Sequence, residues 1–365
     1  MKIFHSLVLL FVLITFNLYA QETKQKIHAL YIPLADHYAA LVAFERYASQ
    51  MKYADFEIEQ MPNWDLLRAY FQSGEVDMAY VMTPLAIDMY NEKAHFRWIG
   101  LMHRDGNALA VNELLLKNIV LKGDRLERKP DAQSALAFQA AFKTYKKPTQ
   151  VGLPHLLSTH AVVLYRYLKE HHTSLSFTPN EKADVLGISI APPKAPAFIK
   201  IKSKKSTPAA FEQSLPWADV VETGGFGKVV WYSKDVMPWK YGHVECITLA
   251  TDTAIKNKEK ALKEVMYYLH KAGADIEIAK KEGGKELDAI VKIVRKHIPL
   301  HTAPAIRASL RSDLEVINYT HLNIDKKGLQ LIMNYALEGK ILKKGLNIDE
   351  FADERFHIDL KKGGM

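Results

Sequence analysis

Cysteine is nearly absent from this chain. Cys246 is the only one in 365 residues, so no disulfide can form within the chain. Hydrophobic residues make up 48% of the sequence, and a chain of this length can build hydrophobic cores for two lobes of ordinary domain size. The composition therefore predicts a globular protein whose stability comes from packing rather than from crosslinks.

Common catalytic and nucleotide-binding motifs are missing as well. The sequence contains no HExxH and no G-x-S-x-G, and the glycines at 224–227 do not match a dinucleotide-binding or phosphate-binding loop. His155 and His160 are five residues apart, so they are not the i, i+4 pair of a zinc protease. We therefore predict no catalytic residue, no cofactor and no enzymatic activity.

One short segment contains residue types that bind metals. It reads His243-Val244-Glu245-Cys246. If this segment is a strand, alternation places His243 and Glu245 on one face and Cys246 on the other. The pattern therefore predicts no metal site.

The only long apolar run lies at the N-terminus. Residues 7–16 are almost wholly apolar, Lys2 precedes them, and Ala20 is followed by polar residues. The run is short for a membrane span, so it predicts a secretory signal peptide, residues 1–20, that is cleaved after Ala20 to give a periplasmic protein. An uncleaved N-terminal anchor is the alternative.

Basic residues are in excess, with a formal net charge of +8. Much of this excess lies in short runs at 117–129, 143–147 and 200–205. These runs lack the interleaved aromatic residues of a nucleic-acid surface, so they indicate solvated faces and no nucleic-acid partner. The basic balance favours an anionic ligand or an anionic membrane surface.

The first part of the chain alternates between strand-like and helix-like segments. Expected strands are 26–32, 56–60 and 78–82, and expected helices are 37–50 and 64–72. A β-α-β-α-β order predicts parallel pairing, and ligands bind beyond the carboxyl ends of such strands. Three polar and aromatic loops, at 33–38, 62–64 and 83–84, should therefore converge on one crevice.

A second strand-to-helix unit occupies 149–172. The strand at 149–153 ends at Pro154, and Ser158-Thr159-His160 precedes a helix with apolar periodicity. With Ser158 as the N-cap, backbone N–H groups, two hydroxyls and an imidazole meet where a small oxyanion could bind. An ordinary capped helix whose His160 only packs is the alternative.

The remaining segments suggest where the lobes divide. Residues 117–147 indicate a crossover with an exposed helix, the prolines of 191–196 predict an extended or turn-like run, and 251–365 is mainly helical. Helices are expected at 256–271, 275–281, 286–297 and 326–337. The predicted division is lobe I from 26–115, the crossover and lobe II from 116–245, and a return to lobe I with C-terminal helices from 246–365.

Several segments together resemble the nitrate/sulfonate/bicarbonate (taurine-like) class of periplasmic substrate-binding proteins. They read YIPLADHYAALVAFERYA, PNWDLLRAYFQSGEVDMAYVMTPLAI, LPHLLSTHAVVLYRYL, APPKAP and LPWADVVE. The resemblance covers about residues 26–300. It implies an α/β protein with the two-lobe periplasmic binding protein type II fold, which binds a small anion or organic anion between its lobes. It also implies delivery of that anion to an ABC permease and its ATPase in the inner membrane.

The resemblance and the loop positions together give the candidate ligand-binding residues. They are Pro33, Leu34, Ala35, Asp36, His37, Trp64, Thr83, Pro84, His155, Ser158, Thr159, His160, Pro216 and Trp217. Because a carboxylate repels an anion, Asp36 is expected to point away or to cap the next helix. The chain departs from the family pattern at Leu215, where many relatives have glutamate, and it lacks a glutamine near Ala108 and Leu109. The polar cluster at 212–214 indicates a distinct subfamily.

Two other functions share this fold. A periplasmic sensor would pass the ligand signal to a membrane kinase or cyclase by the same closure of lobes, and an enzyme of the thiamine-pyrimidine synthesis type would turn its ligand over. The export signal, the two-lobe order and the lack of catalytic motifs favour a transport receptor that acts as a monomer.

Overall fold

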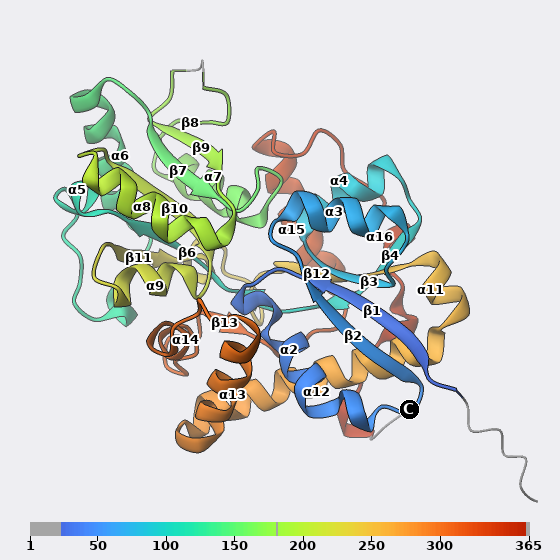
Figure 1. Ribbon diagram of the computed structural model, residues 1–365. Coiled ribbons are helices and arrows are strands. Elements are labelled where there is room, and N and C mark those ends of the chain that lie inside the picture. Colours follow the sequence, from blue (N-terminus) through green and yellow to red (C-terminus); the bar gives the residue numbers. More distant parts are fainter. Residues whose placement is uncertain (1–22, 180–181, 363–365) are drawn as a thin grey trace, which may run out of the picture.

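The computed structural model describes residues 23–179 and 182–362, which form two lobes, each built on its own β-sheet (Figure 1). The predicted signal peptide lies outside these residues. The predicted α/β class is confirmed. Helices cover the sheets, and the helical C-terminal region, coloured orange to red in Figure 1, packs along both lobes.

The sheet of lobe I has five strands within the described residues, in the order β2-β1-β3-β12-β4. β1 is parallel to β2 and β3, as the sequence predicts, whereas β12 runs antiparallel to both of its neighbours. All five residues of β3 are buried, which explains why this strand is a continuous apolar run. The bounds are β1 Gln25–Tyr31, β2 Ala54–Gln60, β3 Met78–Met82, β4 Phe96–Leu101 and β12 Cys246–Thr251.

The sheet of lobe II has six strands in the described part of the chain, in the order β11-β6-β10-β7-β9-β8. β7, β8, β9 and β10 are mutually parallel, and β6 is antiparallel to β10 and β11. The bounds are β6 Asn107–Val111, β7 Thr149–Leu153, β8 Leu175–Ser176, β9 Val185–Ser189, β10 Ala209–Ser214 and β11 Lys228–Tyr232.

The crossing from lobe I to lobe II comes earlier than the predicted residue 116. β6 already belongs to the second sheet, so the chain crosses at 102–106. At this crossing β5 (Arg104–Asp105) pairs with β13 (Ile317–Asn318) from the C-terminal region. Sequence periodicity could not locate the crossing because β4 and β6 are both short buried strands.

Helices of the first 240 residues flank the two sheets. In lobe I they are η1 Ala35–His37, α2 Tyr38–Tyr47, η2 Ala48–Gln50, α3 Trp64–Ser73 and α4 Thr83–Glu92. In lobe II they are α5 Glu113–Leu116, η3 Arg125–Glu127, α6 Ala132–Tyr145, α7 Thr159–Glu170, η4 Pro192–Lys194, α8 Ala195–Lys204, α9 Trp217–Thr223 and α10 Ser233–Val236.

The proline-rich run at 191–196 is helical, which corrects the predicted extended segment. Pro192 opens the 3-10 turn η4, and Pro196 lies in the first turn of α8. A proline fits there because the first N–H groups of a helix have no partner within the helix and its φ is already helical.

The C-terminal helices connect the lobes. Their bounds are α11 Asp252–Asn257, α12 Glu259–Glu282, α13 Gly284–His297, α14 Ala303–Ser309, α15 Lys326–Glu338, α16 Ile348–Phe351, η5 Glu354–Phe356 and η6 Leu360–Lys362. α12 packs on α2 of lobe I, α14 packs on α9 of lobe II, and α15 touches both α4 and α7. The region past residue 300 is therefore part of the body that holds the lobes together.

Candidate functional site

One edge of the lobe I sheet collects three polar loops. β1, β3 and β4 all end at this edge, and the antiparallel β12 begins there, with Cys246 paired to Met82. Asp36 follows β1, His103 follows β4, and Glu245 directly precedes β12. Strand direction alone therefore brings together residues that are more than 200 positions apart.

Lobe II brings the carboxyl end of β10 and the start of α7 to the same place. Ser214, the last residue of β10, donates a hydrogen bond of 2.7 Å to Asp36 Oδ2. His160 Nε2 lies 2.9 Å from Ser214 Oγ, and its Nδ1 lies 3.4 Å from Glu245 Oε1. His103 lies between Asp36 and Glu245, and Cys246 Sγ faces Asp36. We call this group the interlobe cluster: Asp36, His103, His160, Ser214, Glu245 and Cys246.

Every member of the interlobe cluster is fully buried, yet many of its polar atoms have no hydrogen-bond partner. Burying a polar atom without a partner costs about 1–3 kcal/mol, so native proteins satisfy nearly all of them. Such a concentration indicates that something other than the protein completes these bonds. The atoms without a hydrogen bond in and beside the cluster are Asp36 Oδ1, both ring nitrogens of His103, Thr159 Oγ1, His160 Nδ1, and both carboxyl oxygens of Glu212 and Glu245. Among them, His103 Nε2 and His160 Nδ1 lie 3.3–3.5 Å from carboxylate oxygens of the cluster.

Charge within the cluster is balanced around His103. Burial disfavours its charged form, but the carboxylates of Asp36 and Glu245 outweigh this and raise the pKa of His103 to about 10. Burial opposes ionisation of the two carboxyls too, but His103 lowers the pKa of both. The protein alone therefore holds one imidazolium between two carboxylates.

Other groups in and near the cluster are uncharged. Burial, reinforced by the charges of Glu245 and Asp36, raises the pKa of Glu212 and of the Cys246 thiol well above their ordinary values. Burial lowers the pKa of His160, which is therefore a neutral imidazole. Glu212 consequently carries a proton that it can donate.

An aromatic group adjoins the cluster on the lobe I side. The His37 ring lies 6.1 Å from Trp64 and 5.6 Å from Tyr80, measured between ring centroids. Trp64 Nε1, Tyr80 Oη and His37 Nε2 are buried without a partner. Burial lowers the pKa of His37 to about 4, so this imidazole is neutral. The indole N–H and the phenol O–H are free hydrogen-bond donors.

The predicted residues at the starts of helices occupy three different environments. Thr83 begins α4, and its hydroxyl donates to the carbonyl of Glu245 at 2.7 Å, so it positions that residue; Pro84 follows it in the helix. Ser158 is the N-cap of α7 and accepts a hydrogen bond from Ala161 N–H. His155 lies apart from the cluster, 3.4 Å from Asp65.

Three predicted residues, Pro33, Ala35 and Trp217, form a contact between the lobes, and two more adjoin them in the sequence. Ala35 N–H donates to the Leu215 carbonyl, and Trp217 Nε1 donates to the Pro33 carbonyl at 3.0 Å. These bonds hold the two lobes in contact beside the cluster. The two that adjoin them are Leu34 and Pro216.

Two expectations about individual side chains are wrong. Asp36 neither points away nor caps a helix; it points into the cluster and accepts from Ser214. Glu245 and Cys246 do not lie on opposite sides, because the regular strand begins only at Cys246 and alternation does not extend to Glu245. His243, in contrast, lies within 2.9 Å of the Ser233 hydroxyl, away from the cluster.

Sequence reasoning did not select most of the cluster. The polar run at 212–214 and the segment at 243–246 gave a signal, since both place charged residues beside apolar strands. Nothing in the sequence singled out His103 or Tyr80. The residues missed are Tyr80, His103, Glu212, Ser214, Glu245 and Cys246.

A pocket of about 550 Å³ lies elsewhere in lobe II. Tyr145, Pro148 and Thr149 line it at the start of β7, opposite the end where α7 begins. Ligands of parallel sheets bind at the carboxyl ends of strands, so the interlobe cluster is the better candidate.

Comparison with known protein families identifies the chain. A model of the NMT1-like family matches residues 20–291. The chain belongs to the NMT1-like family. A search of curated proteins found no significant match.

Three similar solved structures are described as ligand-binding proteins. The nitrate-binding protein NrtA from Synechocystis PCC 6803 superposes with a TM-score of 0.72 at 16% identity, covering 92% of this chain and 87% of that one. The ligand-binding component of an ABC-type import system from Staphylococcus aureus, solved with zinc bound, superposes with a TM-score of 0.68 at 18% identity. The match covers 91% of this chain and 98% of that one. The aliphatic sulphonate-binding protein SsuA from Escherichia coli superposes with a TM-score of 0.63 at 13% identity, covering 90% of this chain and 92% of that one.

These similarities confirm the resemblance seen in the sequence and the two-lobe periplasmic binding protein fold. The similar structures with a described role bind ligands and are not described as enzymes. No helix among residues 23–179 and 182–362 is both long and apolar enough to cross a membrane.

Proposed function

We propose that this NMT1-like protein is the periplasmic solute-binding component of an ABC import system. It captures a small anion or organic anion between its two lobes and delivers it to a permease and ATPase in the inner membrane, without turning the ligand over. The protein is exported by its signal peptide, cleaved after Ala20, and acts as a monomer.

The observation that carries this proposal is the set of buried, unpartnered polar atoms contributed by both lobes. In solute-binding proteins of two lobes, each lobe supplies part of the polar shell, and the ligand completes it when the lobes close. Here the cluster lies where Asp36 of lobe I meets Ser214 of lobe II.

Hydrogen-bond donors in this region favour an oxyanion. Trp64 N–H and Tyr80 O–H are available on the lobe I side, while the Thr159 hydroxyl and the protonated Glu212 are available on the lobe II side. Thr159 is also the first residue of α7, so backbone N–H groups and the positive end of the helix dipole add to the attraction.

Calorimetry on the purified mature chain tests this proposal. Nitrate, bicarbonate, methanesulfonate and taurine are titrated in turn, and we expect at least one to bind with one site per chain. Thr159→Val and Trp64→Phe each remove one donor, which should weaken binding by about tenfold to a hundredfold.

Trp231→Phe is the matched control. Trp231 is buried in β11 against Tyr167, away from the cluster, so the same chemical change there should leave affinity within about twofold. If none of the four anions binds, or if all three variants bind the anion equally well, the proposal is wrong.

A further inference from the structure

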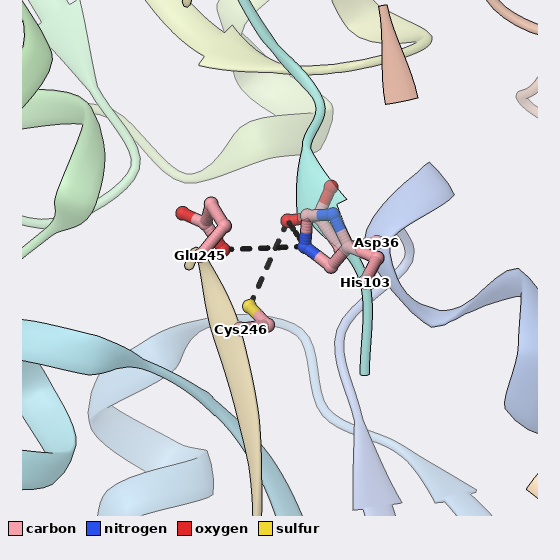
Figure 2. A group of neighbouring side chains, drawn as sticks. All are labelled: Asp36, His103, Glu245 and Cys246. Atoms are coloured by element: carbon pink, nitrogen blue, oxygen red, sulfur yellow. Dashed lines mark hydrogen bonds and ion pairs between the residues drawn. The ribbon is translucent and has the colours of Figure 1, made fainter. Parts of the chain in front are cut away.

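Four residues of the interlobe cluster place metal-binding atoms around one point (Figure 2). Asp36, His103, Glu245 and Cys246 each direct one donor atom inward, and all four donor atoms lie within 4.8 Å of one another. All four side chains are buried: Asp36 and Cys246 belong to lobe I, His103 lies in the segment that crosses to lobe II, and Glu245 directly precedes β12. The set therefore lies at the edge of the lobe I sheet, where the chain passes between the lobes.

The two separations between His103 and the carboxylates are longer than hydrogen bonds between such groups. His103 Nε2 lies 3.3 Å from Glu245 Oε2 and 3.5 Å from Asp36 Oδ2, and Cys246 Sγ lies 3.7 Å from Asp36 Oδ2. Charge-assisted hydrogen bonds between nitrogen and oxygen are about 2.7–2.9 Å long. Zinc bonds of about 2.0 Å to nitrogen and oxygen and 2.3 Å to sulfur place neighbouring tetrahedral donors about 3.3–3.5 Å apart. The three separations resemble the edges of such a tetrahedron.

Lobe II contacts two of these four residues. The Ser214 hydroxyl donates a 2.7 Å hydrogen bond to Asp36 Oδ2, and His160 Nδ1 lies 3.4 Å from Glu245 Oε1. These contacts hold both carboxylates beside His103 and Cys246.

We propose that Asp36, His103, Glu245 and Cys246 together bind one divalent cation of the zinc type. One nitrogen, one sulfur and two carboxylate oxygens suit a borderline-soft cation, whereas Mg²⁺ and Ca²⁺ prefer oxygen ligands alone. On binding, the thiol and the imidazolium each lose a proton to solvent, so both residues coordinate through free electron pairs.

The second shell of this site is also in place. Thr83 holds the backbone of Glu245 by its hydroxyl and its N–H, and Ser214 holds the second donor residue, Asp36, from lobe II. Such outer contacts fix ligand orientation. One further step rests on the proposed function: the cation faces Thr159 and Glu212 of lobe II, and the anion binds between the cation and these two residues.

Calorimetric titration of ZnCl2 into the chelator-treated mature chain tests the site, with MgCl2 as the comparison cation. We expect one zinc per chain with a submicromolar dissociation constant and no magnesium binding at the same concentrations. Asp36→Asn and His103→Gln should weaken zinc binding by at least about a hundredfold, the upper end of the cost of losing an outer-shell partner. His270→Gln, at a buried histidine of α12 far from the cluster, should change it by less than about twofold.

Cys246→Ser keeps the test decisive if the other variants fail to fold. Cobalt bound to the wild-type chain should show a thiolate-to-metal charge-transfer band, and Cys246→Ser should lose that band while circular dichroism stays unchanged. Absence of zinc binding by the wild-type chain would overturn the site. Zinc affinities of Asp36→Asn and Cys246→Ser equal to that of the wild-type chain would overturn it as well. Anion titrations with and without zinc separate the two proposals. Zinc binding without anion binding would contradict the proposed function alone, and anion binding without zinc binding would contradict the metal site alone.

Discussion

Ser214 of lobe II donates a 2.7 Å hydrogen bond to the buried carboxylate of Asp36 in lobe I. The bond therefore links the occupancy of the cluster to the relative position of the lobes. A ligand that both lobes contact stabilises the closed arrangement, because each lobe gains its contacts only when the two meet.

Ser214→Ala should loosen this link. The variant leaves one oxygen of a buried carboxylate without its donor, which should cost about 1.5–3 kcal/mol of stability. We expect a larger radius of gyration by small-angle scattering than for the wild type without added ligand. Ser309→Ala, a buried serine whose hydroxyl donates to the Ala305 carbonyl within α14, should leave the radius unchanged. Equal radii for all three proteins would contradict a link through Ser214.

Adjacent residues at the start of α7 should separate stability from binding. Ser158 caps the helix by accepting from Ala161 N–H at 3.0 Å, so Ser158→Ala should lower the free energy of unfolding by about 1 kcal/mol. Thr159→Val removes a hydroxyl that has no partner and should not destabilise the protein. Urea unfolding of both variants measures the difference. A larger loss in Thr159→Val than in Ser158→Ala would show that the roles are reversed.

Arg128 should matter for the stability of lobe II. Its guanidinium donates to Glu222 at 2.8 and 3.2 Å and to the Val229 carbonyl at 2.7 Å, and it is largely buried. Arg128→Met leaves Glu222 short of a partner and should cost about 3–5 kcal/mol. Lys129→Ala is the control, because its ion pair with Asp235 is exposed and such pairs contribute less than about 1 kcal/mol. Similar urea midpoints for the two variants would refute the assignment.

Acid should destabilise the protein through His270. Burial lowers the pKa of His270 to about 4, against about 6.5 for an unfolded histidine. Between these values the unfolded chain binds a proton that the folded chain does not, so stability present above pH 6.5 is lost as the pH falls toward 4. When the pH falls from 7 to 5, the free energy of unfolding of His270→Leu should therefore decrease by about 1–2 kcal/mol less than that of the wild type. Chemical denaturation at the two pH values measures both decreases. Equal decreases for the variant and the wild type would contradict a lowered pKa of His270 in the folded protein.

The sequence was most informative where local rules act without competition. The strand–loop–helix unit at 149–172 is present as predicted, with Ser158 as the N-cap of α7, because capping and apolar periodicity are properties of a few neighbouring residues. The early β-α-β-α-β order is confirmed for the same reason.

Long-range packing explains where prediction failed. The sequence predicts separate helices at 256–271 and 275–281, but the single helix α12 spans both and continues through Gly273. A Cβ at this position would lie 2.4 Å from the Tyr319 carbonyl oxygen, so the glycine allows close packing and does not end the helix. The interlobe cluster could not be predicted from the sequence either, because His103 and Glu245 come together only when β4 and β12 pair.

The central claim is that a ligand completes the interlobe cluster. Native mass spectrometry of the protein, purified under non-denaturing conditions from the cells that produce it, tests the claim without assuming which ligand that is. The account predicts bound mass on the wild-type chain, from an anion, a cation or both, and loss of that mass from a folded variant that combines Thr159→Val with Glu245→Gln. A wild-type chain that carries no bound mass, or the same mass retained by the double variant, would contradict it.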